Sequence, residues 1–275
     1  MKINIVMITY NHEEFIEKAI KGVLMQKCNF DLELILSNDC SSDKTDEVIK
    51  SLLKFTPKNI KIKYLKHEKN IGAIPNFVRS LEACNGKYIA LCDGDDYWID
   101  SNKLQKQVDF LEKNKKINLC GHSVKCNIYN KFLSTKLIYD KSMFLSLKEV
   151  VLSNPIHTSS FLIRNSSSFK EFIKQNFLIG DYPILVYCAQ KEGIFIFNET
   201  MSVYRVDNSN SIWSGKENSK SMEEIFNKTL IKLKNSDGIY NETKRYLNLK
   251  LKGSLKERLI KKTIVIKDKL KKIIS

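Results

Sequence analysis

Apolar runs and amphipathic stretches alternate along the first hundred residues of the chain. Four runs have the apolar character of buried strands, at residues 3–8, 32–36, 60–65 and 88–92. Between them, apolar residues recur at three- and four-residue steps, which predicts helices at residues 15–24, 43–53 and 77–81. This regular strand–helix alternation predicts an α/β fold with a mostly parallel, doubly wound sheet.

The alternation loosens beyond Trp98, although apolar spacing still predicts single elements. Asn11 with Glu14, and Ser146 with Glu149, have the spacing of capping boxes, which satisfy backbone N–H groups at a helix start. The expected elements are a helix at 104–111, a strand at 118–130, a short helix after Ser146, a strand at 157–164, a helix at 181–192 and strands at 194–197 and 201–206. No repeat or low-complexity linker interrupts residues 1 to about 210, which indicates one domain.

The end of the chain has a different pattern, with an apolar stripe set among basic side chains. The stripe consists of Leu255, Leu259, Ile266, Leu270 and Ile273. In residues 242–275, twelve Lys or Arg residues against three acidic ones carry nine of the fifteen net positive charges. The pattern favours a basic amphipathic helix, which either lies in an anionic membrane interface or docks on the rest of the protein.

Composition excludes several classes of protein. No apolar run approaches the roughly 18 residues of a membrane span, and the N-terminus reads as a strand without a signal peptide's long apolar core. The seven cysteines are scattered without a Cys-x-x-Cys pair, which indicates reduced thiols and argues against a zinc site. We therefore predict a cytoplasmic protein and leave open peripheral attachment of its basic tail to the cytoplasmic face of the inner membrane.

Three carboxylates, Asp93, Asp95 and Asp96, lie within four positions directly after the fourth predicted strand. Polar residues also end the first two strands, as Thr9-Tyr10-Asn11 and Asn38-Asp39. Ligands of α/β sheets bind at the carboxyl ends of the strands, and clustered hard oxygen ligands suit Mg²⁺ or Mn²⁺. The residues alone leave a solvated acidic turn open as the alternative.

Five segments carry these polar residues in a recognisable order. They are Ile8-Thr9-Tyr10-Asn11, Asn38-Asp39-Cys40-Ser41-Ser42-Asp43-Lys44-Thr45, Asn70-Ile71-Gly72-Ala73-Ile74-Pro75-Asn76, Asp93-Gly94-Asp95-Asp96 and Gly180-Asp181. In order and spacing they resemble the motifs of the family 2 glycosyltransferases, which have the GT-A fold. Pro75 departs from the family pattern, because relatives often have Arg before the Asn.

The resemblance covers residues 3–206 and implies a domain organisation. A GT-A catalytic domain, with a mostly parallel, Rossmann-like sheet flanked by helices, would span residues 1–213. Its nucleotide-sugar-binding half would be residues 1–100 and its acceptor-side half residues 101–213. Residues 214–275 would form a helical, basic C-terminal extension.

The resemblance also implies roles for single residues. Thr9 and Tyr10 would line the nucleobase pocket, and Asn11 would also bind the nucleotide sugar. Asp39 would accept the N3–H of uracil, and Asn70 and Asn76 would lie near the base and ribose. Asp95 would bind the metal, Asp93 would lie near the ribose or the metal, and Asp181 would be the general base. Read without the resemblance, Asp39, Asn76 and Asp181 fit helix caps equally well.

Four further residues are candidates for contacts with the acceptor or the diphosphate, namely His157, Tyr182, Arg205 and Asp207. Asp207 stands where many relatives carry a His that completes the metal site, so it is also a candidate third ligand. For His157, Tyr182 and Arg205 the alternative is packing or a structural ion pair.

The resemblance implies an inverting glycosyltransferase of the hexosyl or N-acetylhexosaminyl type that depends on Mn²⁺ or Mg²⁺. Its donor would be a nucleotide sugar, with UDP favoured, and its acceptor a glycan or lipid-linked saccharide in bacterial surface polysaccharide synthesis. A sugar-phosphate nucleotidyltransferase is one alternative, but it would favour a Gly-rich, basic loop after the first strand, which residues 9–14 are not. A nucleic-acid-binding protein would spread its charge over a face, whereas here the tail holds it, so no nucleic-acid partner is expected.

Overall fold

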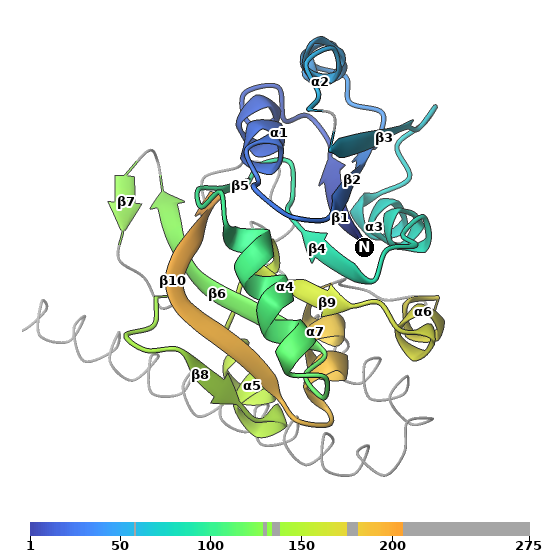
Figure 1. Ribbon diagram of the computed structural model, residues 1–275. Helices are drawn as coiled ribbons and strands as arrows, with labels where there is room; N and C mark the ends of the chain where they lie inside the picture. The colour runs from blue at the N-terminus through green and yellow to red at the C-terminus, as the bar shows by residue number, and fades with distance from the viewer. Residues whose placement is uncertain (58, 129–130, 134–137, 175–180, 206–275) are drawn as a thin grey trace, which may run out of the picture.

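The strands predicted for the first hundred residues lie in one sheet (Figure 1). The computed structural model describes residues 1–57, 59–128, 131–133, 138–174 and 181–205. Strand β1 (Lys2–Thr9) lies between β2 (Asp31–Asn38) and β4 (Tyr88–Leu91), and β3 (Ile60–Lys66) pairs with the outer edge of β2. All of these pairs are parallel, so the loops that follow the four strands meet at one edge of the sheet.

The second half of the described chain extends the same sheet with mixed pairing. β9 (Leu162–Arg164) is antiparallel to both β4 and β6 (Leu119–Ile128), and β6 runs parallel to β10 (Ile194–Arg205). Three short strands, β5 (Tyr97–Trp98), β7 (Lys131–Leu133) and β8 (Met143–Leu145), complete it by antiparallel pairs. The predicted fold class, a mostly parallel α/β sheet flanked by helices, is confirmed for the described residues.

Helices cover both faces of the sheet, and the alternation of side chains along β1 shows why. Ile3, Ile5 and Met7 pack on one face with α1 (Ile16–Leu24), α2 (Thr45–Leu53) and α4 (Lys103–Lys113). Val6 points to the other face, which is covered by α3 (Ala73–Glu82), α5 (Leu147–Ser153), α6 (Ser167–Ile173) and α7 (Asp181–Ala189). No helix of the described part has the length and apolar character needed to cross a membrane.

Three details differ from the sequence predictions. The strands expected at 194–197 and 201–206 are one strand, β10, whose pairing with β6 shifts register between Phe197 and Ser202. The strand expected at 157–164 begins with a 3₁₀ turn, η1 (Thr158–Ser160), before β9. The capping box at Ser146 is confirmed, but α1 begins after Phe15 without a side-chain cap, so the box expected at Asn11 is wrong.

Lys103, the first residue of α4, is completely buried. The Lys103 ammonium donates to Gln107 Oε1 at 2.7 Å and lies 4.1 Å from the centre of the Trp98 ring. Among the described residues, no carboxylate lies within ion-pair distance of it. Burial lowers the pKa of Lys103 to about 7, because the charged form is poorly solvated there.

Replacing Lys103 with Met is expected to stabilise the fold, and most strongly below pH 7. The lowered pKa means that folding carries a desolvation penalty that is complete below about pH 7 and fades as pH rises toward the ordinary lysine value of ~10.4. Removing a buried charge of this kind gains about 1–3 kcal/mol. Urea unfolding at pH 6 and pH 9 measures the change in the free energy of unfolding, and the exposed Lys113→Met is the control. A loss of stability, or a change of the same size at both pH values, would contradict the interpretation.

Candidate active site

The loops after β1, β2 and β4 are tied together at the carboxyl edge of the sheet. The Asp39 amide donates to the Thr9 carbonyl at 2.9 Å, and the Gly94 amide donates to the Ile8 carbonyl at 2.9 Å. A Cβ at Gly94 would lie 2.8 Å from Thr9 Oγ1, so only glycine lets the acidic segment approach β1 this closely. The buried Thr9 hydroxyl at this junction has no hydrogen-bond partner among the described residues.

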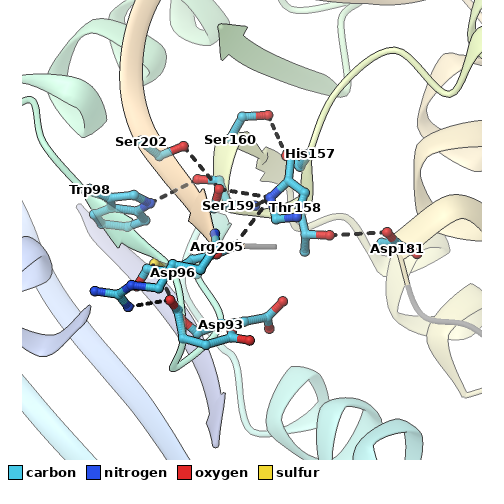
Figure 2. A network of polar contacts seen from close by, with 12 residues as sticks. Asp93, Asp96, Trp98, His157, Thr158, Ser159, Ser160, Asp181, Ser202 and Arg205 are labelled. Atoms are coloured by element: carbon cyan, nitrogen blue, oxygen red, sulfur yellow. Dashed lines mark hydrogen bonds and ion pairs between the residues drawn. The ribbon is translucent and has the colours of Figure 1, made fainter. Parts of the chain in front are cut away.

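The acidic loop, Asp93–Asp96, presents its three carboxylates differently. Asp93 and Asp95 are partly exposed, whereas Asp96 is 1% exposed. Asp96 Oδ1 accepts a hydrogen bond from the Arg205 amide at 3.1 Å, and Asp96 Oδ2 lies 3.4 Å from His157 Nδ1 (Figure 2). Asp96 therefore anchors the loop, and Asp93 and Asp95 are its accessible carboxylates.

Arg205 supports the acidic loop from the end of β10. Its guanidinium donates to the Asp95 carbonyl and lies 4.8 Å from the ring centres of both Phe15 and Tyr97. The predicted contact of Arg205 with the acceptor or the diphosphate stays a prediction; among the described residues, its guanidinium contacts these two rings and this carbonyl. In the structure Arg205 fixes the course of the acidic loop.

Negative charge accumulates around Asp93. Burial, together with the nearby carboxylates of Asp95 and Asp181, raises the pKa of the Asp93 carboxyl to about 8. No described side chain or amide donates a hydrogen bond to this carboxylate. Such a group is stabilised in its ionised form by a bound cation.

A divalent cation fits Asp93 and Asp95 only if the substrate completes its ligand set. The described residues contain no group of three or more His, Cys, Asp or Glu side chains arranged to hold a metal. Mg²⁺ usually binds proteins through one or two carboxylates together with substrate phosphates, and two accessible carboxylates at a strand end match that donor set. Asp207, the candidate third ligand, lies outside the described residues.

Asp181 starts α7 and faces the acidic loop from the other half of the sheet. Its Oδ2 accepts a hydrogen bond from the Thr158 hydroxyl at 3.2 Å, and its Oδ1 accepts one from the Tyr182 amide at 2.7 Å. Burial raises the pKa of Asp181, and these two hydrogen bonds oppose that rise. Because its charge raises the pKa of Asp93, the two carboxylates share one site.

Asp39 shapes the loop that follows β3. Its two carboxylate oxygens accept hydrogen bonds from the Ile71 amide at 2.8 Å and the Gly72 amide at 2.9 Å. The Asn70 side chain accepts a hydrogen bond from the same Gly72 amide at 3.0 Å. Both predicted nucleoside contacts are therefore next to each other, and Asp39 holds the loop that carries Asn70.

Three predicted site residues have their polar groups engaged within the fold. The buried Asn76 amide bonds to Ser37 and His67, which joins α3 to β2 and β3. The Asn11 side chain accepts from the Ser42 amide at 2.9 Å, and the buried Tyr182 hydroxyl donates to the Val151 carbonyl at 3.0 Å. In each case these hydrogen-bond partners lie outside the acidic loop, whereas Tyr10 is 38% exposed.

His157 lies inside the site, but as a buried side chain. Its ring stacks on Tyr204 with 3.8 Å between ring centres, and burial lowers the pKa of His157 to about 4. The neutral ring joins Asp96 to the η1 turn. The sequence analysis included Asp96 in the acidic cluster but did not predict its role as a buried anchor, and it missed Thr158, although the His-Thr-Ser-Ser run was a visible signal.

Comparison with known proteins gives one family. The family model described as glycosyl transferase family 2 matches residues 4–173. The protein Rv1520 of Mycobacterium tuberculosis is 34% identical over 212 residues, which are 76% of this chain and 60% of that protein. The chain thus covers less than two thirds of the length of that relative.

One further relative and one solved structure are similar. TuaG of Bacillus subtilis, named for teichuronic acid biosynthesis, is 32% identical over 123 residues, or 44% of this chain and 47% of TuaG. The structure of S. aureus TarS 1–349 in complex with UDP-GlcNAc has a TM-score of 0.72 at 15% identity and covers 91% of this chain and 72% of that one. At this identity the TarS likeness shows the fold alone.

Proposed function

Because the chain belongs to glycosyl transferase family 2, we propose that it is an inverting, metal-dependent glycosyltransferase that takes its sugar from a UDP-sugar. The observation that carries the proposal is the meeting of two acidic groups. The Asp93 and Asp95 carboxylates end the parallel half of the sheet, and Asp181 faces them from the half that contains β6, β9 and β10. An inverting transfer needs one acidic group to hold the cation that stabilises the leaving diphosphate and another to remove the proton of the acceptor hydroxyl. These two groups act from opposite sides of the sugar.

The donor would bind along the loops after β1, β2 and β3. Tyr10 is exposed and offers an aromatic face for uracil, and the buried Thr9 hydroxyl directly before it has no hydrogen-bond partner among the described residues. Asp39 already accepts two amides, but each carboxylate oxygen has a second lone pair that can accept the uracil N3–H. The UDP-GlcNAc named with TarS supports this choice of nucleotide.

The transfer itself would be a single displacement. The acceptor hydroxyl attacks the anomeric carbon while the bond from that carbon to the diphosphate oxygen breaks, and Asp181 takes the hydroxyl proton. A divalent cation held by Asp95 and Asp93 would supply neutralisation of the departing diphosphate. The raised pKa of Asp181 suits a general base, because a base works best when its pKa is close to the working pH.

The acceptor would be a glycan or a lipid-linked saccharide of a bacterial surface polymer. TuaG, a relative over 44% of this chain, carries a name from such a pathway.

A thermal-shift panel tests the donor. UDP-, GDP-, dTDP- and CMP-sugars are compared with and without Mn²⁺, because a ligand that binds only the native state raises the melting temperature. We expect a UDP-sugar with Mn²⁺ at about 100 times its Kd to raise it by roughly 5–10 °C. A larger shift with another nucleotide sugar would contradict the proposed preference for UDP. Equal shifts with and without Mn²⁺ would contradict metal-dependent binding of the donor.

The basic tail is proposed to attach the enzyme peripherally to an anionic leaflet. Residues 242–275 lie outside the described residues, so the support is their pattern of basic side chains around an apolar stripe. Near an anionic surface each Lys or Arg adds roughly 1 kcal/mol of attraction. Co-sedimentation with anionic vesicles at low salt should be lost on removal of residues 242–275; a truncated chain that binds equally well would refute the attachment.

A further inference from the structure

The turn from His157 to Ser160 lies between the acidic loop and Asp181 (Figure 2). It contains the 3₁₀ turn η1 with His157 as its N-terminal cap. Neither half of the sheet alone fixes the distance between the acidic loop and Asp181, because the loop follows β4 whereas Asp181 begins α7. The turn contacts both of them, so its anchorage decides how firmly they are held relative to each other.

The turn is anchored to the acidic loop through His157. His157 Nδ1 lies 3.4 Å from Asp96 Oδ2, and the same ring stacks on Tyr204 of β10. Asp96 in turn accepts a hydrogen bond from the Arg205 amide. One end of the turn therefore follows the position of the acidic loop.

The middle of the turn is fixed by buried hydrogen bonds to β5 and β10. The Trp98 indole N–H donates to the Ser159 carbonyl at 2.9 Å, and the Ser159 and Ser202 hydroxyls are 3.0 Å apart. Trp98, Ser159 and Ser202 are all at most 1% exposed. A turn held in this way has little freedom to shift when ligands bind.

Thr158 is the residue of the turn that contacts Asp181: its hydroxyl donates to Asp181 Oδ2 at 3.2 Å. Thr158 is 7% exposed, so water competes weakly for this hydrogen bond. The other carboxylate oxygen of Asp181 is held by the Tyr182 amide, which belongs to the same helix. Thr158 is thus the described contact that ties this carboxylate to the rest of the site.

We propose that Thr158 is a positioning residue, which orients the Asp181 carboxylate toward the acceptor and holds it at a fixed place relative to the acidic loop. The inference rests on the proposed role of Asp181 as the general base. Thr158 does not itself touch the reacting atoms. It acts through Asp181, and the His157–Ser160 turn transmits the position of the acidic loop to it.

The charge around Asp181 gives the inference a measurable sign. A hydroxyl that donates to the carboxylate favours its ionised form, so the Thr158 bond lowers the pKa of Asp181 against the effect of burial. Of the residues that the structure describes, the other titratable groups that interact with Asp181 are Asp93 and Tyr204, and neither is altered when the Thr158 hydroxyl is removed. Loss of that hydroxyl should therefore raise the pKa of Asp181 and move the acid limb of the pH–rate profile to higher pH.

The test compares Thr158→Val and Thr158→Ala, which remove the hydroxyl, with Thr158→Ser, which keeps it. The rate of UDP release from the UDP-sugar selected by the thermal-shift panel is followed across pH with Mn²⁺ present, and UDP affinity is measured by calorimetry. We expect Val and Ala to move the acid limb up by roughly one pH unit and to lower kcat several-fold, with UDP affinity unchanged. Ser should restore the parental limb.

Ser160→Ala is the matched control, because its hydroxyl donates within the turn, to the His157 carbonyl at 2.7 Å, and makes no bond to Asp181. Its acid limb should coincide with that of the parent. If Val and Ala both keep the parental limb, Thr158 is only a packing residue and the inference fails. If Asp181→Asn itself keeps ordinary turnover, the proposed base is wrong, which is a different result from an unmoved limb in the Thr158 variants.

Discussion

Replacing Asp95 with Asn is expected to abolish turnover and to remove the Mn²⁺ dependence of UDP binding. Asn keeps the size of the side chain but loses the negative charge that a hard cation requires. Without cation-assisted stabilisation of the leaving diphosphate, several kcal/mol of transition-state stabilisation are lost, which corresponds to roughly a thousandfold or more in rate. The fold should persist, because the Arg205 guanidinium supports the loop at the Asp95 carbonyl, which the Asn residue keeps.

Calorimetric titration of UDP with Mn²⁺ or with a chelator measures this directly. The parent should bind UDP more tightly with Mn²⁺, and the Asp95→Asn variant should bind it equally under both conditions. Asp31→Asn is a suitable control, since Asp31 is exposed at the start of β2, at the opposite edge of the sheet. Metal-dependent binding that survives in the Asp95 variant would reject Asp95 as the principal ligand.

Replacing Asp181 with Asn is expected to lower turnover by about 10²–10⁴, the usual effect of removing a general base. The Asn side chain can still accept a hydrogen bond from Thr158 or Tyr182, so the start of α7 should keep its conformation. UDP affinity should stay close to that of the parent, because the proposed role of Asp181 is to accept the proton of the acceptor hydroxyl and not to bind the nucleotide.

The pH dependence separates a base from a helix cap at this position. Asp181 must be ionised to accept a proton, and burial raises its pKa, so parental turnover should fall as pH decreases through a value above that of an ordinary aspartate. The Asp181→Asn variant should lack this acid limb in its residual rate. Ordinary turnover in the variant would leave Asp181 as a cap for α7 and nothing more.

Local patterns predicted the parallel half of the sheet well, because each of its strands is recognisable from its own run of apolar residues. Apolar runs gave β1, β2, β3 and β4 nearly at their bounds, and the polar residues after them lie at one edge. The capping box at Ser146 was predicted correctly for the same reason, since both partners lie within four residues. The spacing of Asn11 and Glu14 was equally suggestive, but Asn11 bonds instead to Ser42, 31 residues away.

Long-range contacts set the limits of the prediction within the site. Nothing local distinguishes Asp96, the buried anchor, from the accessible Asp95, because the difference depends on β10 and on His157. Thr158 acquires its role from the start of α7, 23 residues further along the chain. Tyr182 was a candidate for contact with the acceptor or the diphosphate, with packing as the alternative; in the structure it is buried, and its hydroxyl donates to the Val151 carbonyl.

The products of donor cleavage test the proposed chemistry most directly. The parental protein is incubated with the selected UDP-sugar and Mn²⁺, with water or a saccharide as acceptor, and the nucleotide products are separated by chromatography. A glycosyltransferase with this site should release UDP as the nucleotide product, and both a chelator and Asp95→Asn should suppress the release. Formation of UTP and sugar 1-phosphate on addition of pyrophosphate, with no release of UDP, would instead identify a nucleotidyltransferase and contradict the proposal.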